Sequence, residues 1–347
     1  MKRERILLLV AALLLTAAAA YYVHHRHREP LAVAPGPVPA LLEQLPSGAP
    51  LIAFVDLAAL RASPFAAKIE ALAPEPAEER EYKDFVAQTG FDYARDLDRV
   101  ALAVWPGSIK TTAAAIAEGR FDREKISQYA LKSGTVTKRG NLDVFQVRET
   151  LPAPSNPGTA QKTIELAFLL SNRIAFADGV PLDSALASGA AKPADAGMRE
   201  RIERVAGASF FATAQVKNLP TDILFAGTNS DQLRRILRSV QFASLAGRPE
   251  RERLHVSLDA ECDSVSSAVQ LSTLLDGLRW FGRAALADAN TRKQLLPQAA
   301  VLLDMLLKGV DISRQNKVVR LRLELTPPML GAPPKSAAPK SPTASSH

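Results

Sequence analysis

The chain has 347 residues, of which 47% are hydrophobic, and it contains one cysteine. This length can bury a sizeable core and corresponds to about two domains of ordinary size. The formal net charge is +7, but three of these charges belong to residues 1–30 and two to residues 331–347, which leaves +2 for the body. Nucleic-acid binding needs basic residues gathered on one face, so we expect no nucleic-acid partner. A single cysteine also excludes an intrachain disulfide and a thiolate metal cluster.

Residues 1–28 predict a membrane anchor or a signal. A short basic segment precedes Ile6–Val23, an uncharged and mostly Leu/Ala run. Its eighteen residues extend roughly 27 Å as a helix, enough to cross a thin bilayer core. Tyr21 and Tyr22 lie where interfacial aromatic residues gather. The alternative is a cleaved secretory signal with its site in Ala17–Ala20. We therefore expect a single-pass inner-membrane protein with a periplasmic body, or a soluble periplasmic protein.

The composition divides the remaining chain into four parts. Residues 29–49 are rich in proline and predict a linker that holds the body away from the membrane. Residues 50–192 and 197–327 form two predicted globular halves. Residues 328–347 are Pro, Ala, Ser and Lys for the most part, too irregular to predict ordered structure.

Alternating and continuous apolar runs, interrupted by turn residues, predict the elements of each half. In the first half we expect strands at 51–57, 100–105, 112–119, 135–147 with a turn near Gly140, 164–170 and 173–179, and helices at 62–72, 78–89, 122–132 and 182–186. In the second half we expect strands at 208–216, 239–246, 253–262 and 318–325, a turn at 247–249, and helices at 198–205, within 219–237, at 264–286 and at 292–307.

The patterns of residues 99–132 and 239–273 predict one supersecondary unit that is used twice. Each segment reads as strand, turn, strand and a helix that opens at an aspartate, Asp122 or Asp263. The predicted fold class is therefore α+β: two related ferredoxin-like or sandwich-like halves, each an antiparallel sheet with helices on one face, after an N-terminal transmembrane helix.

Residues able to carry out acid–base chemistry or bind metal are sparse in the body. His255 is its one histidine, and it faces away from Leu254 and Val256 in an alternating strand, which is typical of a structural role. Asp92, Asp96 and Asp98 lack the spacing of a calcium loop, so we expect them to cap helices or pair with Arg95 or Arg99. Cys262 is expected to be a small buried residue. We predict no metal and no cofactor.

Nucleophile and phosphate-binding motifs are absent from the sequence. The most distinctive local string is Gly119-Arg120-Phe121-Asp122, which reads as a strand-to-helix turn. Its functional alternative makes Arg120 a contact for an anion or a partner beside a helix N-terminus. The apolar helix after Pro297 is the other candidate interaction surface, because its apolar residues cannot all face one core stripe. The candidate residues there are Leu303, Leu306 and Leu307.

The strings FVDLAALRASP, TGFDYARDLDRVALAV and AEGRFDREKI resemble uncharacterised single-pass bacterial envelope proteins over most of residues 50–190. That resemblance implies an envelope location and supplies no activity. The chain also looks similar to membrane-anchored ferredoxin-like components of secretion and pilus machines. The leading hypothesis is a non-enzymatic, membrane-anchored scaffold or binding module with a protein partner in the envelope. The alternative is an exported hydrolase that uses Asp and Glu.

Overall fold

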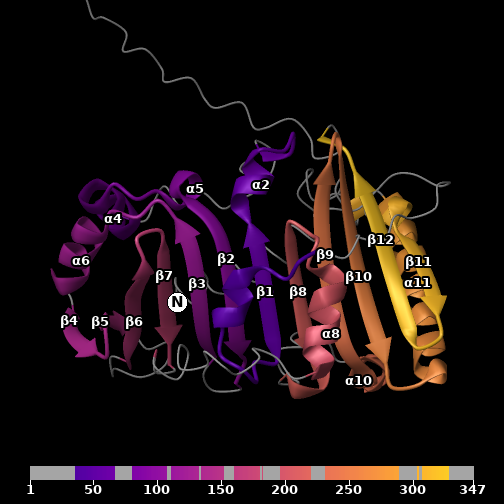
Figure 1. Ribbon diagram of the computed structural model, residues 1–347. Helices are drawn as coiled ribbons and strands as arrows, with labels where there is room; N and C mark the ends of the chain where they lie inside the picture. The colour runs from indigo at the N-terminus through magenta and orange to yellow at the C-terminus, as the bar shows by residue number, and fades with distance from the viewer. Residues whose placement is uncertain are drawn as a thin grey trace, which may run out of the picture.

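The computed structural model describes residues 36–66, 80–107, 111–132, 134–151, 160–179, 182, 196–219, 231–288, 303–304 and 307–327. Its strands form one antiparallel sheet in the order β11-β12-β10-β9-β8-β1-β2-β3-β7-β6-β5-β4 (Figure 1). The strands are β1 Leu51–Asp56, β2 Leu97–Trp105, β3 Thr112–Gly119, β4 Gly134–Arg139, β5 Leu142–Leu151, β6 Ala160–Leu170, β7 Arg173–Asp178, β8 Phe210–Gln215, β9 Val240–Glu250, β10 Arg253–Cys262, β11 Asp311–Gln315 and β12 Val318–Leu325. The predicted mixture of helices with a large antiparallel sheet is confirmed.

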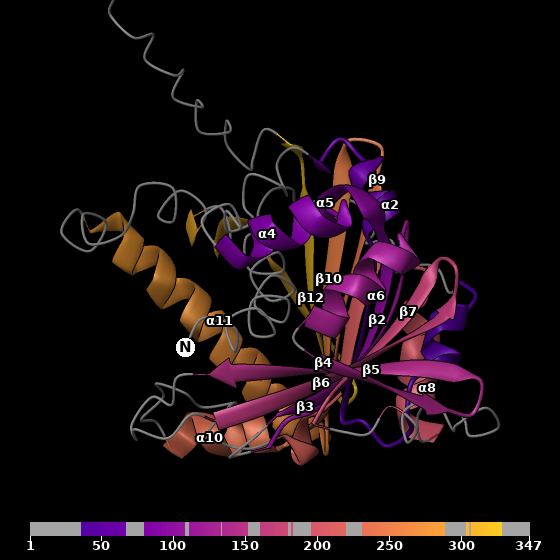
Figure 2. The same ribbon diagram turned by 90° about the vertical axis from the view of Figure 1, so that its left-hand side faces the viewer.

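Helices connect the strands and lie on both faces of the sheet. They are η1 Ala40–Gln44, α2 Leu57–Arg61, α4 Arg80–Thr89, α5 Tyr93–Asp96, α6 Arg123–Lys132, α8 Ala196–Val205, η3 Val216–Asn218, α10 Asp231–Arg238 and α11 Val265–Ala287. Figure 2 shows α8 on one side of the sheet and α10 and α11 on the other. Among the described residues, no helix combines the length and the apolarity needed to cross a bilayer. The predicted anchor, Ile6–Val23, and residues 328–347 lie outside the described ranges.

The centre of the sheet explains why helices are needed on both faces. Ile52 and Phe54 of β1 face η1 and α8 in the largest core cluster, whereas Ala53 belongs to a separate cluster on the opposite face. All three side chains are buried. A strand that is apolar without alternation has to be covered on both sides. The predicted limitation of helices to one face is therefore wrong.

The pairing of β1 with β8 joins strands of the two predicted halves. The two strands run antiparallel from Leu51 opposite Ala214 to Val55 opposite Phe210. Next to this pair, β1-β2-β3 and β8-β9-β10 are meanders, in which consecutive strands are hydrogen-bonded neighbours. The expectation of a separate sheet in each half is corrected, because the unpaired edges of β1 and β8 satisfy each other's backbone groups.

The turn predicted at 247–249 lies elsewhere. β9 continues to Glu250, and the tight turn is formed by Arg251 and Glu252, with Arg251 at a φ of 52°. Gly247 stays in the strand because the ring of Phe210 lies over it, where a Cβ atom would collide. The glycine was therefore needed for a close approach, not for a turn.

Helix boundaries were predicted unevenly. α11 begins one residue later than expected, because Ser264 accepts the amide of Ser267 (3.1 Å) and acts as N-cap in place of Asp263. Asp122 caps α6 as predicted, accepting the amide of Lys125 at 3.1 Å. Of the helix predicted at 62–72, residues 62–65 form turns and bends, and residues 67–72 lie outside the described ranges. The preceding short helix α2, which Asp56 caps through the amide of Ala59, was not predicted. The sequence analysis also missed β11, whose side chains are mostly exposed and so give no apolar signal.

Part of the predicted linker belongs to the core. Of residues 29–49, the structure describes 36–49, and within them Leu41, Leu42 and Leu45 are buried in the main cluster beside β1, β2 and β3. Three leucines within five positions bring enough apolar surface to dock a short helix on the sheet. The body therefore begins before residue 50.

Candidate functional site

The string that contains Arg120 forms a compact polar corner at the end of β3. The backbone of Asp96 lies so close to Gly119 that a Cβ atom would collide with its carbonyl oxygen. Arg120 donates through Nε to the Asp96 carboxylate (3.2 Å) and through Nη2 to the Arg95 carbonyl. Phe121 stacks on Phe91 with ring centroids 5.1 Å apart. Every residue of the string therefore has a contact within the fold.

Asp96 is the centre of this corner and is only 7% exposed. Its carboxylate accepts from Arg95 (2.7 Å), from Arg120 and from the backbone amide of Asp92 (3.0 Å). These donors, Arg95 first, hold the pKa of Asp96 far below its usual range despite the opposing effect of burial. The candidate residue Arg120 is thus placed as part of an internal ion-pair network.

The neighbouring aspartates have structural roles, but Asp98 does not pair with Arg95 or Arg99 as predicted. Asp92 caps α5 by accepting the amide of Ala94 at 3.0 Å. Asp98 pairs with Arg61 at 2.6 Å, and Arg99 pairs with Asp56 at 3.0 Å. Across the described ranges, no group of three or more His, Cys, Asp or Glu side chains is arranged to hold a metal ion.

Two further carboxylates on strands of the sheet, Glu165 and Asp259, are held by arginines in the same way. Glu165 accepts two hydrogen bonds from Arg139 (2.7 and 3.0 Å) and one from the amide of Leu182. Burial would raise its pKa, but these donors lower it overall. Asp259 receives a bidentate pair from Arg320 at 2.7 and 2.6 Å. A general acid needs a raised pKa, and the contacts of Glu165 have the opposite effect.

His255 and Cys262 lie as the alternation predicted. Leu254 and Val256 are buried while His255 points to the other face, with Nε2 3.9 Å from Glu250. Cys262 is buried in the cluster under α11, and burial raises the pKa of its thiol. A buried, protonated thiol is a poor nucleophile.

The apolar segment after Pro297 is described only in part. Leu303 and Leu307 are half-buried, and Leu306 lies outside the described residues. Leu307 packs against Gly282 of α11, at a place where a Cβ atom on residue 282 would come within 2.7 Å of its side chain. Leu307 therefore meets another element of the same chain.

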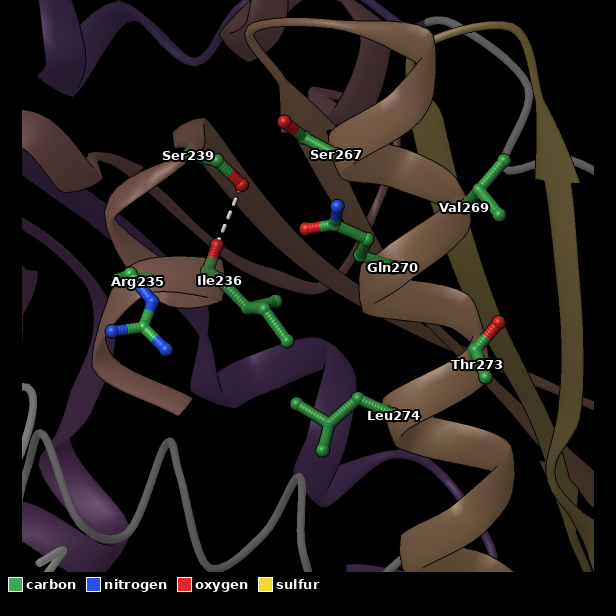
Figure 3. A pocket seen from close by; sticks show the side chains of 8 residues that line it. All are labelled: Arg235, Ile236, Ser239, Ser267, Val269, Gln270, Thr273 and Leu274. Carbon is green, nitrogen blue, oxygen red and sulfur yellow. Dashed lines mark hydrogen bonds between the residues drawn. The ribbon is translucent and has the colours of Figure 1, made fainter. Parts of the chain in front are cut away.

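A pocket of about 690 Å³ lies between α10 and α11. Figure 3 shows Ile236 of α10 and Leu274 of α11 pointing toward each other, with Gln270 above them and the Arg235 guanidinium at the side. The other lining residues in the described part of the chain are Ser239, Ser267, Val269 and Thr273. The Ser239 hydroxyl is used, since it donates to the carbonyl of Ile236 at 2.6 Å. The pocket thus has an apolar floor and a polar rim.

The charge at this rim is positive. Arg235 and Arg238 of α10 are exposed, and within the described part of the chain neither has a carboxylate within 4.0 Å. An arginine without a carboxylate partner among the described residues could pair with an anionic group of a ligand. The sequence analysis did not single out these residues, because the pairing of α10 with α11 is a tertiary contact; the available signal was the dense basic content of DQLRRILR.

Comparisons with known proteins add little at the level of function. No family model matches the chain, and no curated protein sequence matches it. Among solved structures it is similar to three crystal forms of TP0453: form III at 9% identity and a TM-score of 0.46, form IV at 10% and 0.47, and form I at 10% and 0.42. These alignments cover 84% of this chain and 96%, 94% and 95% of the other chain. Likeness at this level says nothing about a ligand or an activity.

Proposed function

We propose that this protein is a non-enzymatic binding module of the bacterial envelope, tethered to the inner membrane by Ile6–Val23, with the body in the periplasm. Its binding surface is the groove between α10 and α11, and its partner is a protein segment with apolar side chains and a carboxylate. The observation that carries the proposal is the pocket, where Ile236 and Leu274 form the floor beside Arg235.

The groove has the features of a helix-in-groove recognition site. Two roughly facing helices leave an apolar floor that a partner's leucine-like side chain would fill, and arginine is enriched in such interfaces. Arg235 supplies a charge with which an acidic residue of the partner would pair. The exposed amide of Gln270 would hydrogen-bond to its polar edge, whereas the Ser267 hydroxyl already contacts the Ser264 hydroxyl at 2.8 Å.

The proposal extends to the architecture of the body, as two related halves that meet at β1 and β8. From the β1–β8 pair outward, the neighbouring strands are β1-β2-β3-β7 in one direction and β8-β9-β10-β12 in the other. Each series thus begins with three consecutive strands of the chain. In both halves a helix, α6 or α11, follows the third strand. This correspondence supports an origin by duplication of one unit.

The alternative, a carboxylate-based hydrolase, receives less support. Such an enzyme needs two carboxylates whose environments push their pKa values apart. Asp96, Asp122, Glu165 and Asp263 all have lowered pKa values, through arginine contacts or helix-end hydrogen bonds.

Site-specific photo-crosslinking in cells tests the binding surface. A photoreactive residue at position 270 should give one dominant adduct, and Arg235→Glu should reduce that adduct at least fivefold. Gln128 provides a matched control, because it is also an exposed glutamine within a helix, α6. We expect no adduct at position 128.

Two results would contradict the proposal. Equal adduct patterns at positions 270 and 128 would mean that the groove has no specific partner. Turnover of an ester, peptide or glycoside by the purified protein, lost in an Asp or Glu variant of normal stability, would favour the hydrolase instead.

A further inference from the structure

The exposed aromatic side chains of α11 lie in line with the pocket of the α10–α11 groove. Thr273 and Leu274 line the pocket (Figure 3), and Trp280 and Phe281 follow them at a distance of seven positions. Seven residues make almost two turns of a helix, so each ring lies within about 20° of the direction of its counterpart in the pocket. Trp280 is 66% exposed and Phe281 is 67% exposed. The lining of the pocket therefore continues beyond it along the same side of α11.

The body holds a different side of this helix. The buried residues of α11 are Ala268, Leu271 and Leu286. On the same side, Gly282 lies against the side chain of Leu307. Successive residues of a helix are about 100° apart, so both aromatic rings point more than about 100° away from the mean direction of the buried residues. The surface that continues the pocket is thus left uncovered by the contacts that attach α11 to the body.

Gly277 makes a notch in the middle of this surface. It comes three positions after Leu274 and four before Phe281, and residues at these spacings share one side of a helix. A Cβ atom on residue 277 would have no neighbouring atom within 4 Å, so the space above the glycine is open. Glycine inside a helix is destabilising relative to alanine. Since no close contact within the fold requires a glycine here, the notch indicates a side chain that comes from outside.

The residues around the notch have the arrangement that receives a side chain of another helix. Four residues at positions i, i+3, i+4 and i+7 form the hole in which a knob from a facing helix packs. Leu274, Gly277, Leu278 and Phe281 have this spacing, and Leu278 is 51% exposed. The fourteen positions from Ser267 in the pocket to Phe281 correspond to about 21 Å along the axis. A partner helix of about four turns would cover this length.

The charge beside this surface is on α10 and is positive. Arg235 and Arg238 are exposed, and neither has a carboxylate within 4.0 Å in the described part of the chain. On α11, Asp276 pairs with Arg279 at 3.0 Å, so this pair adds no net charge. A partner with acidic residues on the side that faces α10 would be complementary. A symmetric dimer through this surface would instead gather the arginines of two copies, and residues 328–347 contain two lysines and no acid.

We infer that the α10–α11 groove and the α11 surface beyond it form one docking surface for an amphipathic helix of another protein. The partner helix is about four turns long, places a large apolar side chain over Gly277 and pairs an acidic side chain with Arg235. The inference rests on the proposed function, because it specifies the length, the conformation and the charge of the partner of that groove.

Photo-crosslinking of the full chain in cells at two positions tests the inference. A photoreactive phenylalanine analogue is placed at position 270 or at position 281, and the attachment sites on the partner are mapped by mass spectrometry. The two positions are eleven residues apart, or about 16 Å along α11. We expect both positions to attach to one protein, at sites about eleven residues apart in its sequence. An extended segment would give sites only about five residues apart.

Gly277→Leu tests the notch. The variant fills the open space above residue 277, so it should reduce the adducts at positions 270 and 281 at least fivefold. Leucine favours a helix more than glycine does, so the thermal unfolding midpoint should not fall. Ser272→Leu is the matched control, because Ser272 is a partly exposed small residue of the same helix about 140° from Gly277. The control should leave both adducts unchanged.

The position of the adducts separates the two possible failures. Absence of an adduct at position 270 would refute the proposed function, and this inference with it. An adduct at position 270 without one at position 281, or adducts that Gly277→Leu leaves unchanged, would refute the inference alone. Attachment of position 281 to a lipid, to a second copy of this chain, or to sites with the spacing of an extended segment would also overturn it.

Discussion

Arg120 and Arg235 show how differently one residue type is used in two regions of this molecule. Arg120 contacts the Asp96 carboxylate and the Arg95 carbonyl, so its donors are spent inside the fold. Arg235 lies at the rim of the α10–α11 pocket with no carboxylate partner among the described residues. The contacts around Arg120 stabilise the fold, whereas the helix pair around Arg235 exposes polar and apolar groups that a partner could contact.

The largest effect on stability is expected from Asp96, which is the centre of the corner around Arg120. Asp96→Ala removes the acceptor of Arg95, Arg120 and the Asp92 amide, and it should lower the free energy of unfolding by about 2–3 kcal/mol. Urea denaturation measures the change. The folded Asp96→Ala variant should still give the photo-crosslinked adduct at position 270. Loss of that adduct would mean that the Asp96 corner also affects binding in the α10–α11 groove.

The pH dependence of the same corner gives a second test. A lowered pKa in the folded state means that Asp96 contributes fully above the pKa of the unfolded chain and loses its contribution as the pH falls toward the folded value. Asp96→Asn should cost about 1.5 kcal/mol at pH 7, and the gap to the native chain should close progressively below about pH 4. Denaturation at several pH values measures the gap. A gap independent of pH would show that the charge of Asp96 does not matter.

The two arginines can be compared directly by the same substitution. Arg120→Ala should lower the free energy of unfolding by about 1 kcal/mol, because the Asp96 carboxylate and the Arg95 carbonyl lose a donor. Arg235→Ala should change it by less than about 0.5 kcal/mol. Crosslinking of the partner at position 270 should fall in Arg235→Ala and stay unchanged in Arg120→Ala. Loss of crosslinking in Arg120→Ala, with stability intact, would restore Arg120 as the partner contact.

The smallest effect on stability is expected on the outer surface of α11. Leu278→Ser together with Phe281→Ser should shift the free energy of unfolding by no more than about 0.5 kcal/mol, since both side chains are largely exposed. Calorimetry measures the change; a large loss of stability would mean that this surface is covered within the fold.

Local signals determined most of the secondary structure. The alternation in residues 253–262 and 318–325 located β10 and β12, and Gly140 marked the turn between β4 and β5, where its φ is +58°. Asp122 announced the start of α6. These features follow from contacts between residues close in the chain, such as strand periodicity, turn conformation and helix capping, so one sequence suffices to read them.

The candidate site was less predictable, because its parts are distant in sequence. The string around Arg120 was correctly read as a turn, but its partner Asp96 lies 24 positions away. The groove joins Ile236 with Leu274, and neither is distinctive alone. The exposure of Trp280 and Phe281 was hidden for the same reason, since aromatic residues on a helix are usually buried.

By itself, the sequence determined the class of elements, their approximate bounds, the burial of Cys262 and the structural use of Asp92, Asp96 and Asp98. Only the tertiary structure decided that β1 and β8 pair to make one sheet, that helices cover both faces, and which arginines remain available. The physical reason is that strand pairing and side-chain exposure depend on which distant segments meet. Backbone groups at a strand edge accept any partner strand, and the local sequence does not specify which one.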